Sequence, residues 1–530
     1  MTSDLCPGGR RQAVLRAGLA GTAAALLAIA GVGSATAQFA ARGGLEADAL
    51  RAGVSARDGQ DLLDFCVANS AECAISVYDV GADRMAHQFP DRPQVLASTS
   101  KILFLLGYAQ AVASGAIDPD ETITKEEWAR YLTLDGFALR SSWESLGKPD
   151  TVSWGDLARM MIRYSDNSTP DHLHGLLGSK RVKNARKLFK GFHDIPIPIG
   201  TMFGLWADGG GIGGEASRIA DSYGSIGAVG YRSEGTALYN ALGKPGPLAT
   251  YRKSLCVTPP WDSPGPCAPP QPPATLDERK FLDRNHFTRS TTRTYMKLME
   301  ALLARTILKQ AERDIIEPIL EIWLEAFPTL SPTFNRYGLK GGSLGVPGGG
   351  LDILTWAHYM RTSGGGEYVV AVFLQALSDA KNPPTSADVN SFAQTFALSP
   401  TFRETVFSTL GADDERAEIV PQILKVKTSG KRQRAAKITV KARAENASPN
   451  ATKGLKMRLY LSADNVLDAD DELLAEASIA KLKAYKGKNA GMKARVTGSA
   501  TGKYLILAVD DDDDIDEQDE DNNILWERLR

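Results

Sequence analysis

The feature that most constrains the fold is residues 96–115, LASTSKILFLLGYAQAVASG, in which Lys101 is the only charged residue. A helix over this stretch is apolar on nearly every side, so it belongs at the centre of a domain and not on its surface. Gly115 is well placed to end the helix, because glycine readily adopts the backbone conformation of a helix C-cap. The sequence therefore predicts a buried central helix, with Ser98 and Lys101 at its start.

The chain of 530 residues is too long for one average domain, so we expect two or three. It is 43% hydrophobic and 23% charged, which is typical of globular proteins and excludes wholesale disorder. The net charge of −2 gives no electrostatic reason to expect a nucleic-acid partner.

The N-terminus has the three-part layout of a secretory signal peptide over residues 1–37. Arg10, Arg11 and Arg16 precede an uncharged Ala, Leu and Gly stretch, which ends in the small residues 35–37. The paired arginines resemble a twin-arginine export signal. An uncleaved membrane anchor is the alternative, but the stretch is weakly hydrophobic for one. We expect an exported protein, periplasmic or extracellular. No later segment has about 18 continuous apolar residues, so no transmembrane span is expected after signal removal.

Four cysteines follow the signal region, and they form two local pairs, Cys66 with Cys73 and Cys256 with Cys267. An oxidising compartment permits a disulfide in each pair. Free buried thiols are the alternative for the first pair. Zinc is disfavoured, because neither pair has CxxC spacing or a cluster of histidines nearby.

Residues 55–400 carry the mixed helix and strand patterns of one large domain. Strand patterns occur near both of its ends, at 73–80, 84–90, 337–345, 351–362 and 367–377. Helical patterns lie mainly between them, at 98–115, 153–164 and 290–323, and a further one closes the region at 386–398. This order predicts an α/β (α+β) domain with a mainly antiparallel sheet and a helical subdomain.

A long insert at about residues 195–280 breaks this regularity, because it is rich in Gly and Pro and weakly periodic. It contains Gly209, Gly211 and Gly214 in GxGxxG spacing. Since no βαβ unit surrounds these glycines, we interpret the segment as a flexible loop and not as a dinucleotide site.

A change in composition marks a second domain. After an expected linker at 401–424, residues 425–443 hold eight basic residues and no acidic one, and residues 509–523 are strongly acidic. The segments between them alternate as strands do. We expect a separate all-β domain over residues 425–530.

Three short motifs carry chemistry, and Ser98 with Lys101 is the first. Residues three apart share a helical face, so the hydroxyl and the amine are neighbours. Serine is a poor nucleophile until a base removes its proton, and a lysine can be that base when burial or nearby positive charge lowers its pKa. Backbone N–H groups at the helix start could hold an oxyanion. Alone, the motif fits an ordinary core helix equally well.

The other two motifs are also ambiguous when taken singly. Ser165 and Asn167, in the sequence SDN, could relay a proton and hold a substrate carbonyl, or could simply end a helix. Lys340, followed by Gly341, Gly342 and Ser343, could place its charge beside a substrate lying along a strand. The alternative is an edge lysine that prevents aggregation.

The three motifs in this order resemble those of class A β-lactamases and the wider penicillin-recognising serine hydrolases, which carry SxxK, SDN and KTG. The resemblance covers about residues 55–400. It implies that Ser98 is the acylated nucleophile, Lys101 its base or proton shuttle and Ser165 the proton relay. It further implies substrate contacts from Asn167, Lys340, Gly341, Gly342 and Ser343, with an oxyanion hole formed by the backbone N–H groups of Ser98 and Ser343.

Two positions depart from the family pattern. Gly341 stands where the family has Thr or Ser, whose hydroxyl helps to hold a substrate carboxylate, and Ser343 is the nearest substitute. The family's deacylating Glu has no recognisable counterpart. Asp208, Glu215, Asp221 and Glu234 lie in the insert, and the sequence selects none of them.

The implied function is an exported serine acyl-hydrolase that forms an acyl-Ser98 intermediate. Its substrate would be a β-lactam, in antibiotic response or β-lactam catabolism, or a cell-wall peptide or ester. No cofactor is required. The alternatives are a penicillin-binding DD-peptidase or esterase with slow deacylation, and a catalytically weak cell-surface binding protein.

The second domain resembles the CARDB family, Ig-like β-sandwich adhesion modules of bacterial surface proteins. The resemblance rests on YLSADNVLDADDELL at 460–474 and LAVDDDDDIDEQDEDNN at 507–523. It implies attachment to a surface ligand, or positioning, with no chemistry of its own. Asp464, Asp468 and Asp470, with the late acidic run, are candidates for a structural Ca²⁺, which prefers hard oxygen ligands. Solvated turn carboxylates are the alternative.

Overall fold

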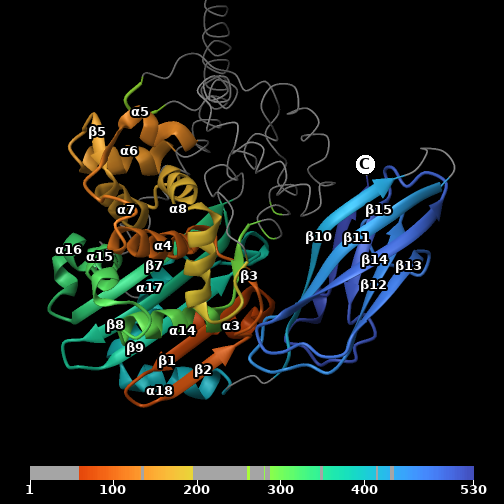
Figure 1. Ribbon diagram of the computed structural model, residues 1–530. Coiled ribbons are helices and arrows are strands. Elements are labelled where there is room, and N and C mark those ends of the chain that lie inside the picture. The colour runs from red at the N-terminus through yellow and green to blue at the C-terminus, as the bar shows by residue number, and fades with distance from the viewer. Residues whose placement is uncertain are drawn as a thin grey trace, which may run out of the picture.

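The computed structural model describes residues 59–132, 136–194, 259–262, 280, 284, 287–345, 350–412, 416–429 and 435–529. The expected signal peptide, most of the insert and the cysteine pair at 256 and 267 lie outside these residues. Figure 1 shows a mixed helix and strand domain beside an all-β domain that contains the C-terminus. Among the described helices, none is long and apolar enough to cross a membrane.

A five-stranded antiparallel sheet forms the base of the first domain. Its order is β2 (Arg84–Gln88), β1 (Cys73–Asp79), β9 (Glu367–Leu374), β8 (Leu351–Thr362) and β7 (Phe334–Gly345). Strand β1 pairs with β9, where Cys73 lies opposite Leu374. The early and late strands of the domain therefore share one sheet, as the sequence predicts.

Helices cover both faces of this sheet. Tyr295 of α14 (Thr292–Leu303) packs edge-on against Phe373 of β9. On the other face, Phe396 of α17 (Ser386–Leu398) packs against Tyr368 of the same strand. Phe373 and Tyr368 are five residues apart, so their side chains point to opposite faces. Helix α3 (Gln60–Ala68) contacts α17, and α18 (Pro400–Thr409) contacts β2.

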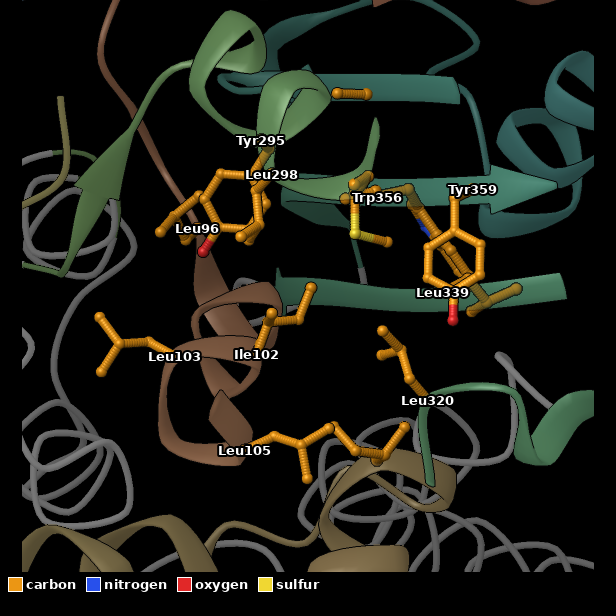
Figure 2. Packing of buried hydrophobic residues seen from close by; sticks show 14 of the residues in the cluster. Leu96, Ile102, Leu103, Leu105, Tyr295, Leu298, Leu320, Leu339, Trp356 and Tyr359 are labelled. Carbon is orange, nitrogen blue, oxygen red and sulfur yellow. The ribbon is translucent and has the colours of Figure 1, made fainter. Parts of the chain in front are cut away.

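The predicted central helix is α4 (Lys101–Ala113), preceded by a short 3₁₀ turn, η2 (Ala97–Ser100). The α4 side chains from Ile102 to Leu106 are fully buried. Burying each such apolar side chain stabilises the fold by about 1.5–3 kcal/mol. Figure 2 shows Ile102 and Leu105 in one apolar interior with Leu320 and Leu339. The charge-free pattern of this stretch thus fixes the centre of the helical subdomain.

The remaining elements of the subdomain surround α4. They are α5 (Lys125–Trp128), α6 (Gly136–Ser145), α7 (Trp154–Arg163), α8 (Ser168–Arg186), α15 (Gln310–Leu320) and α16 (Ile322–Ala326). The first domain also contains two small strand pairs: β3 (Gln94–Val95) with β6 (Arg289–Ser290), and β4 (Thr122–Thr124) with β5 (Thr151–Ser153). Helices α7, α8 and α15 pack directly on α4.

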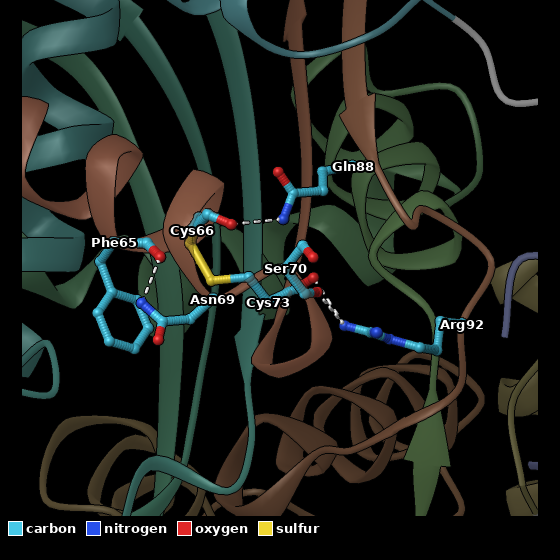
Figure 3. The surroundings of a disulfide bond; sticks show 7 residues. All are labelled: Phe65, Cys66, Asn69, Ser70, Cys73, Gln88 and Arg92. Carbon is cyan, nitrogen blue, oxygen red and sulfur yellow. Dashed lines mark hydrogen bonds between the residues drawn. A yellow bond between two sulfur atoms is a disulfide. The ribbon is translucent and has the colours of Figure 1, made fainter. Parts of the chain in front are cut away.

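A disulfide joins Cys66, near the end of α3, to Cys73 at the start of β1. Figure 3 shows this bridge with neighbouring polar contacts. Gln88 donates to the Cys66 carbonyl, and Arg92 donates to the Cys73 carbonyl at 2.7 Å. The pair that the sequence left open between a disulfide and free thiols is therefore bridged.

The second domain consists of two antiparallel sheets around one apolar core. The three-stranded sheet has the order β10 (Ile419–Ser429), β11 (Ala435–Asn446) and β14 (Gly487–Thr497). The four-stranded sheet has the order β13 (Glu472–Ile479), β12 (Leu455–Ser462), β15 (Tyr504–Val509) and β16 (Ile524–Arg528). Alternate residues of β12 are buried, as expected for a strand with one face on the core.

The expected linker at 401–424 is structured over much of its described length. Helix α18 occupies its first part, because Phe402 and Val406 bury their side chains in the core of the first domain. Strand β10 begins at Ile419, which belongs to the second core. The connection between the domains therefore lies between Thr409 and Ile419.

Candidate active site

Ser98 lies in the tight turn η2, directly before α4. The turn begins at Ala97, whose φ of +44° is unusual for a residue with a Cβ. Hydroxyl groups tie the turn to strand β8: Thr355 donates to the Leu96 carbonyl at 2.7 Å, and its Oγ1 lies 2.9 Å from Thr99 Oγ1. The Ser98 side chain is thus held on a turn fixed to the sheet.

Lys101 brings the first two motifs together. Its side chain is fully buried, and its Nζ lies 3.0 Å from Ser98 Oγ. The same Nζ lies 3.0 Å from Ser165 Oγ and 2.7 Å from Asn167 Oδ1. One amine therefore touches the hydroxyls of both serines, so a proton can pass from one to the other through Lys101.

Asp166, the middle residue of SDN, has a role that the sequence analysis did not assign. It is buried and accepts hydrogen bonds from the backbone N–H of Ser168 and of Thr169, which open helix α8. Trp128 Nε1 donates to the same carboxylate at 3.1 Å. Asp166 therefore caps α8 and fixes the direction of the loop, while Ser165 takes a φ of +61° that turns it towards Lys101.

Lys340 lies on β7, an edge strand of the sheet that contacts the turn η2. Its side chain is fully buried, and Nζ donates to the Gly341 carbonyl at 2.5 Å. A lysine that guards an edge against aggregation is exposed to solvent. The buried position therefore favours the functional interpretation of Lys340 over the alternative.

Gly342 is where β7 meets the turn that holds Ser98. A Cβ at this position would lie 2.5 Å from the Ser98 nitrogen and 2.6 Å from the Thr99 nitrogen. Only glycine permits so close an approach. The contact brings the third motif beside the backbone N–H of Ser98, where the resemblance places an oxyanion hole.

Gly341 departs from the family pattern for a steric reason. It lies opposite Trp356 in the β7–β8 register. A Cβ on Gly341 would stand 2.6–2.7 Å from atoms of the Trp356 indole, and the Trp356 side chain is fully buried. The indole occupies the space that a threonine side chain would need, so glycine at 341 and tryptophan at 356 fit each other.

The buried polar side chains of Tyr295 and His193 support the turn that holds Ser98. Tyr295 OH lies 3.5 Å from the Thr99 carbonyl and 3.3 Å from His193 Nε2. Burial raises the pKa of Tyr295 well above its usual value and lowers the pKa of His193 to about 4. Both groups are therefore neutral at physiological pH, and they support the turn without adding charge.

The candidate Ca²⁺ ligands lie in an exposed turn of the second domain. Asp464 accepts the backbone N–H of Val466, and Asp468 accepts that of Asp470. Within the described ranges, no three His, Cys, Asp or Glu side chains are grouped so that they could hold a metal ion. In the late acidic run, Asp511 and Asp512 pair with Arg458. Asp208, Glu215, Asp221 and Glu234 of the insert lie outside the described residues.

Comparisons with known families agree with both resemblances. Residues 59–197 match the model of the beta-lactamase enzyme family, and residues 422–527 match the CARDB family. The first domain thus has a β-lactamase-like fold, and the C-terminal all-β region matches CARDB, which confirms the predicted fold class. A comparison with curated protein sequences finds no match.

Solved structures similar to this chain include class A β-lactamases and PBP-A. A β-lactamase from Chitinophaga pinensis is 12% identical, with 64% of this chain and 97% of that chain covered and a TM-score of 0.36. A class A β-lactamase from Bacteroides cellulosilyticus is 14% identical, with 67% and 99% covered and a TM-score of 0.37. A PBP-A variant, solved as an acyl-enzyme complex with penicillin G, is 12% identical, with 65% and 96% covered and a TM-score of 0.38.

Proposed function

We propose that this chain is an exported serine acyl-hydrolase that forms an acyl-enzyme on Ser98. The observation that carries the proposal is the position of Lys101 Nζ, within hydrogen-bonding distance of Ser98 Oγ, Ser165 Oγ and Asn167 Oδ1. An ordinary core helix does not need a buried lysine that reaches two serine hydroxyls.

In the acylation step, neutral Lys101 accepts the proton of Ser98 as Oγ attacks the carbonyl carbon of the substrate. The backbone N–H groups of Ser98 and Ser343 stabilise the oxyanion. Ser165 then donates its proton to the leaving nitrogen or oxygen, and Lys101 returns a proton to Ser165. The bond to the leaving group breaks, and the acyl group stays on Ser98.

Asn167 would orient the substrate during this step. Its Oδ1 faces Lys101, so the amide nitrogen points to the opposite side of the planar group. We assign this Nδ2 to a carbonyl of the substrate's acyl side chain. Lys340 supplies positive charge beneath the strand along which the substrate would lie.

The substrate class we propose is a β-lactam or a cell-wall peptide or ester with a similar carbonyl. Gly341 gives no hydroxyl for a substrate carboxylate, and Trp356 closes that space. This weakens recognition of a β-lactam carboxylate. Because the sequence also shows no recognisable deacylating Glu, a slowly deacylating peptidase or esterase is the second candidate. The two are separated by turnover of the acyl-enzyme, because only a β-lactamase releases it quickly.

The test is covalent labelling with a fluorescent penicillin and, separately, with a fluorophosphonate probe. We expect the wild type to be labelled and Ser98→Ala to be unlabelled. Ser100→Ala is the matched control, because Ser100 lies in the same turn and its hydroxyl bonds only the Ala97 carbonyl among the contacts described. No Ser98-dependent label from either probe would refute the proposal. Nitrocefin turnover then distinguishes a β-lactamase from a slowly deacylating enzyme.

Export is proposed on two observations. The N-terminal 37 residues have the composition of a signal peptide. The Cys66–Cys73 disulfide suits an oxidising compartment. N-terminal sequencing of protein secreted by a bacterial host tests this proposal, and a mature chain starting near residue 38 is expected.

A further inference from the structure

The two domains contact each other through a reciprocal pair of hydrogen bonds. Gln518 of the second domain accepts the backbone N–H of Asp91 at 3.0 Å, and its Nε2 donates to Asp91 Oδ2 at 3.2 Å. Asp91 is fully buried and Gln518 nearly so. The Gln518 amide bonds both the backbone N–H and the carboxylate of Asp91, and it can do so only if the two domains keep a fixed relative position.

The first domain holds Asp91 from the other side. Arg293, in the first turn of α14, donates through Nε to both carboxylate oxygens of Asp91, at 2.8 and 3.0 Å. The backbone N–H of Arg293 also donates to the Pro90 carbonyl. Asp91 is therefore enclosed between α14 and the second domain. The loss of Gln518 would remove one donor to its buried carboxylate and the acceptor of its backbone N–H.

Other contacts extend this interface. Phe192 of the first domain forms a small buried cluster with Val420 and Ala447 of the second. Lys297 of α14 reaches the Tyr485 hydroxyl at 3.3 Å. Figure 1 shows the second domain beside the part of the first domain that contains β2, β3 and α3. The interface thus combines apolar burial with hydrogen bonds. A domain joined only by a flexible linker would not form such contacts.

Asp91 starts the segment that leads to the nucleophile. From Asp91 the chain passes through β3, which pairs with β6, and reaches Ser98 seven residues later. The Leu96 N–H donates to the Thr288 carbonyl, and Thr99 N–H donates to the Leu96 carbonyl. A shift of Asp91 would therefore be transmitted along a short, hydrogen-bonded segment to the turn that holds Ser98.

We propose that the C-terminal domain is a fixed part of the catalytic unit and that Gln518, acting through Asp91, is a positioning residue for the Ser98 turn. The inference rests on the proposed function, since positioning has a purpose only if Ser98 reacts. It assigns to the CARDB-like domain a role in the reaction besides any attachment to a surface.

The test uses the full chain with Gln518→Ala. We expect the rate constant of Ser98 labelling at saturating fluorophosphonate to fall by on the order of tenfold. This factor corresponds to the free energy of the hydrogen bonds that Gln518 makes with Asp91. The probe concentration at half-maximal rate and the final labelled fraction should not change. Mere partial unfolding would instead lower the labelled fraction. Tyr460→Phe is the control, because it removes a hydrogen bond to Asp511 inside the second domain.

Two further measurements make the outcome decisive. In an Asp91→Ala background, Gln518→Ala should have a smaller effect on the labelling rate, because only its hydrogen bond to the backbone N–H of residue 91 remains to be lost. An equal tenfold loss there would overturn the inference. Hydrogen exchange of the Leu96 and Thr99 amides should accelerate in Gln518→Ala and not in Tyr460→Phe. If the wild type is not labelled, the proposed function fails, but hydrogen exchange still tests whether Gln518 positions the Ser98 turn. Unchanged exchange of both amides in Gln518→Ala contradicts that positioning role.

Discussion

Gly342 lies directly against Ser98: a Cβ on residue 342 would stand 2.5 Å from the Ser98 nitrogen. This contact joins β7 to the turn that holds Ser98, although the two residues are far apart in the sequence. The oxyanion hole that we propose would draw its two N–H groups from these two segments, so they would have to stay in register. The geometry of the site therefore depends on the sheet as much as on helix α4.

Gly342→Ala should disable acylation by pushing β7 away from the turn. Loss of one oxyanion donor lowers rates by about 10²–10³. We expect a fall of that order in the rate of Ser98 labelling. Gly491→Ala is the matched control, because a Cβ at Gly491 on β14 meets nothing within 4 Å. Equal labelling rates in the two variants would show that the close approach is not required.

Gly341→Thr, which restores the residue of the family motif, should destabilise the protein. The added side chain collides with Trp356, and overpacking of this kind costs about 1–3 kcal/mol. In the double variant Gly341→Thr with Trp356→Leu, the two changes should be less costly than the sum of the single ones. Denaturant unfolding of all four proteins measures this coupling, and strict additivity would contradict the steric explanation.

Stability should fall as pH rises from about 5 to 9, because burial raises the pKa of Glu517 from 4.5 to about 8. The folded chain then holds a proton that the unfolded chain has released, so raising the pH favours unfolding until Glu517 ionises in both states. Glu517→Gln should flatten this dependence, because an amide does not ionise in this pH range. Unfolding free energies at pH 5, 7 and 9 test the prediction. An unchanged slope in the variant would count against it.

The Cys66–Cys73 disulfide should stabilise the first domain modestly. The loop that it closes spans a sequence separation of seven residues, and closing so short a loop contributes roughly 2 kcal/mol. The double variant Cys66→Ala with Cys73→Ala should unfold at a lower temperature and lose the sensitivity of the wild type to reductant. If the reductant lowers the melting temperature of both proteins equally, another thiol pair is responsible.

The sequence predicts the elements of the site better than their contacts. The uncharged stretch after Lys101 has one physical explanation, burial at the centre of a domain, and α4 is found there. The sequence does not reveal the role of Asp166, because only its position shortly before helix α8 indicates that its carboxylate could cap that helix. The match between Gly341 and Trp356 was also missed, since strand register brings together residues fifteen positions apart. Nothing local in the sequence marks Gln518 as a partner of Asp91.

The most direct test of the central claim is mass spectrometry of the protein after incubation with benzylpenicillin or the fluorophosphonate, with peptide mapping of any adduct. We expect one covalent adduct on Ser98, formed at least about 100-fold more slowly in Lys101→Met, because general-base catalysis contributes about 10²–10⁴-fold. The variant must first be shown to be folded by circular dichroism. An adduct on a different residue, or a Ser98 adduct that forms at the same rate without Lys101, would contradict the account.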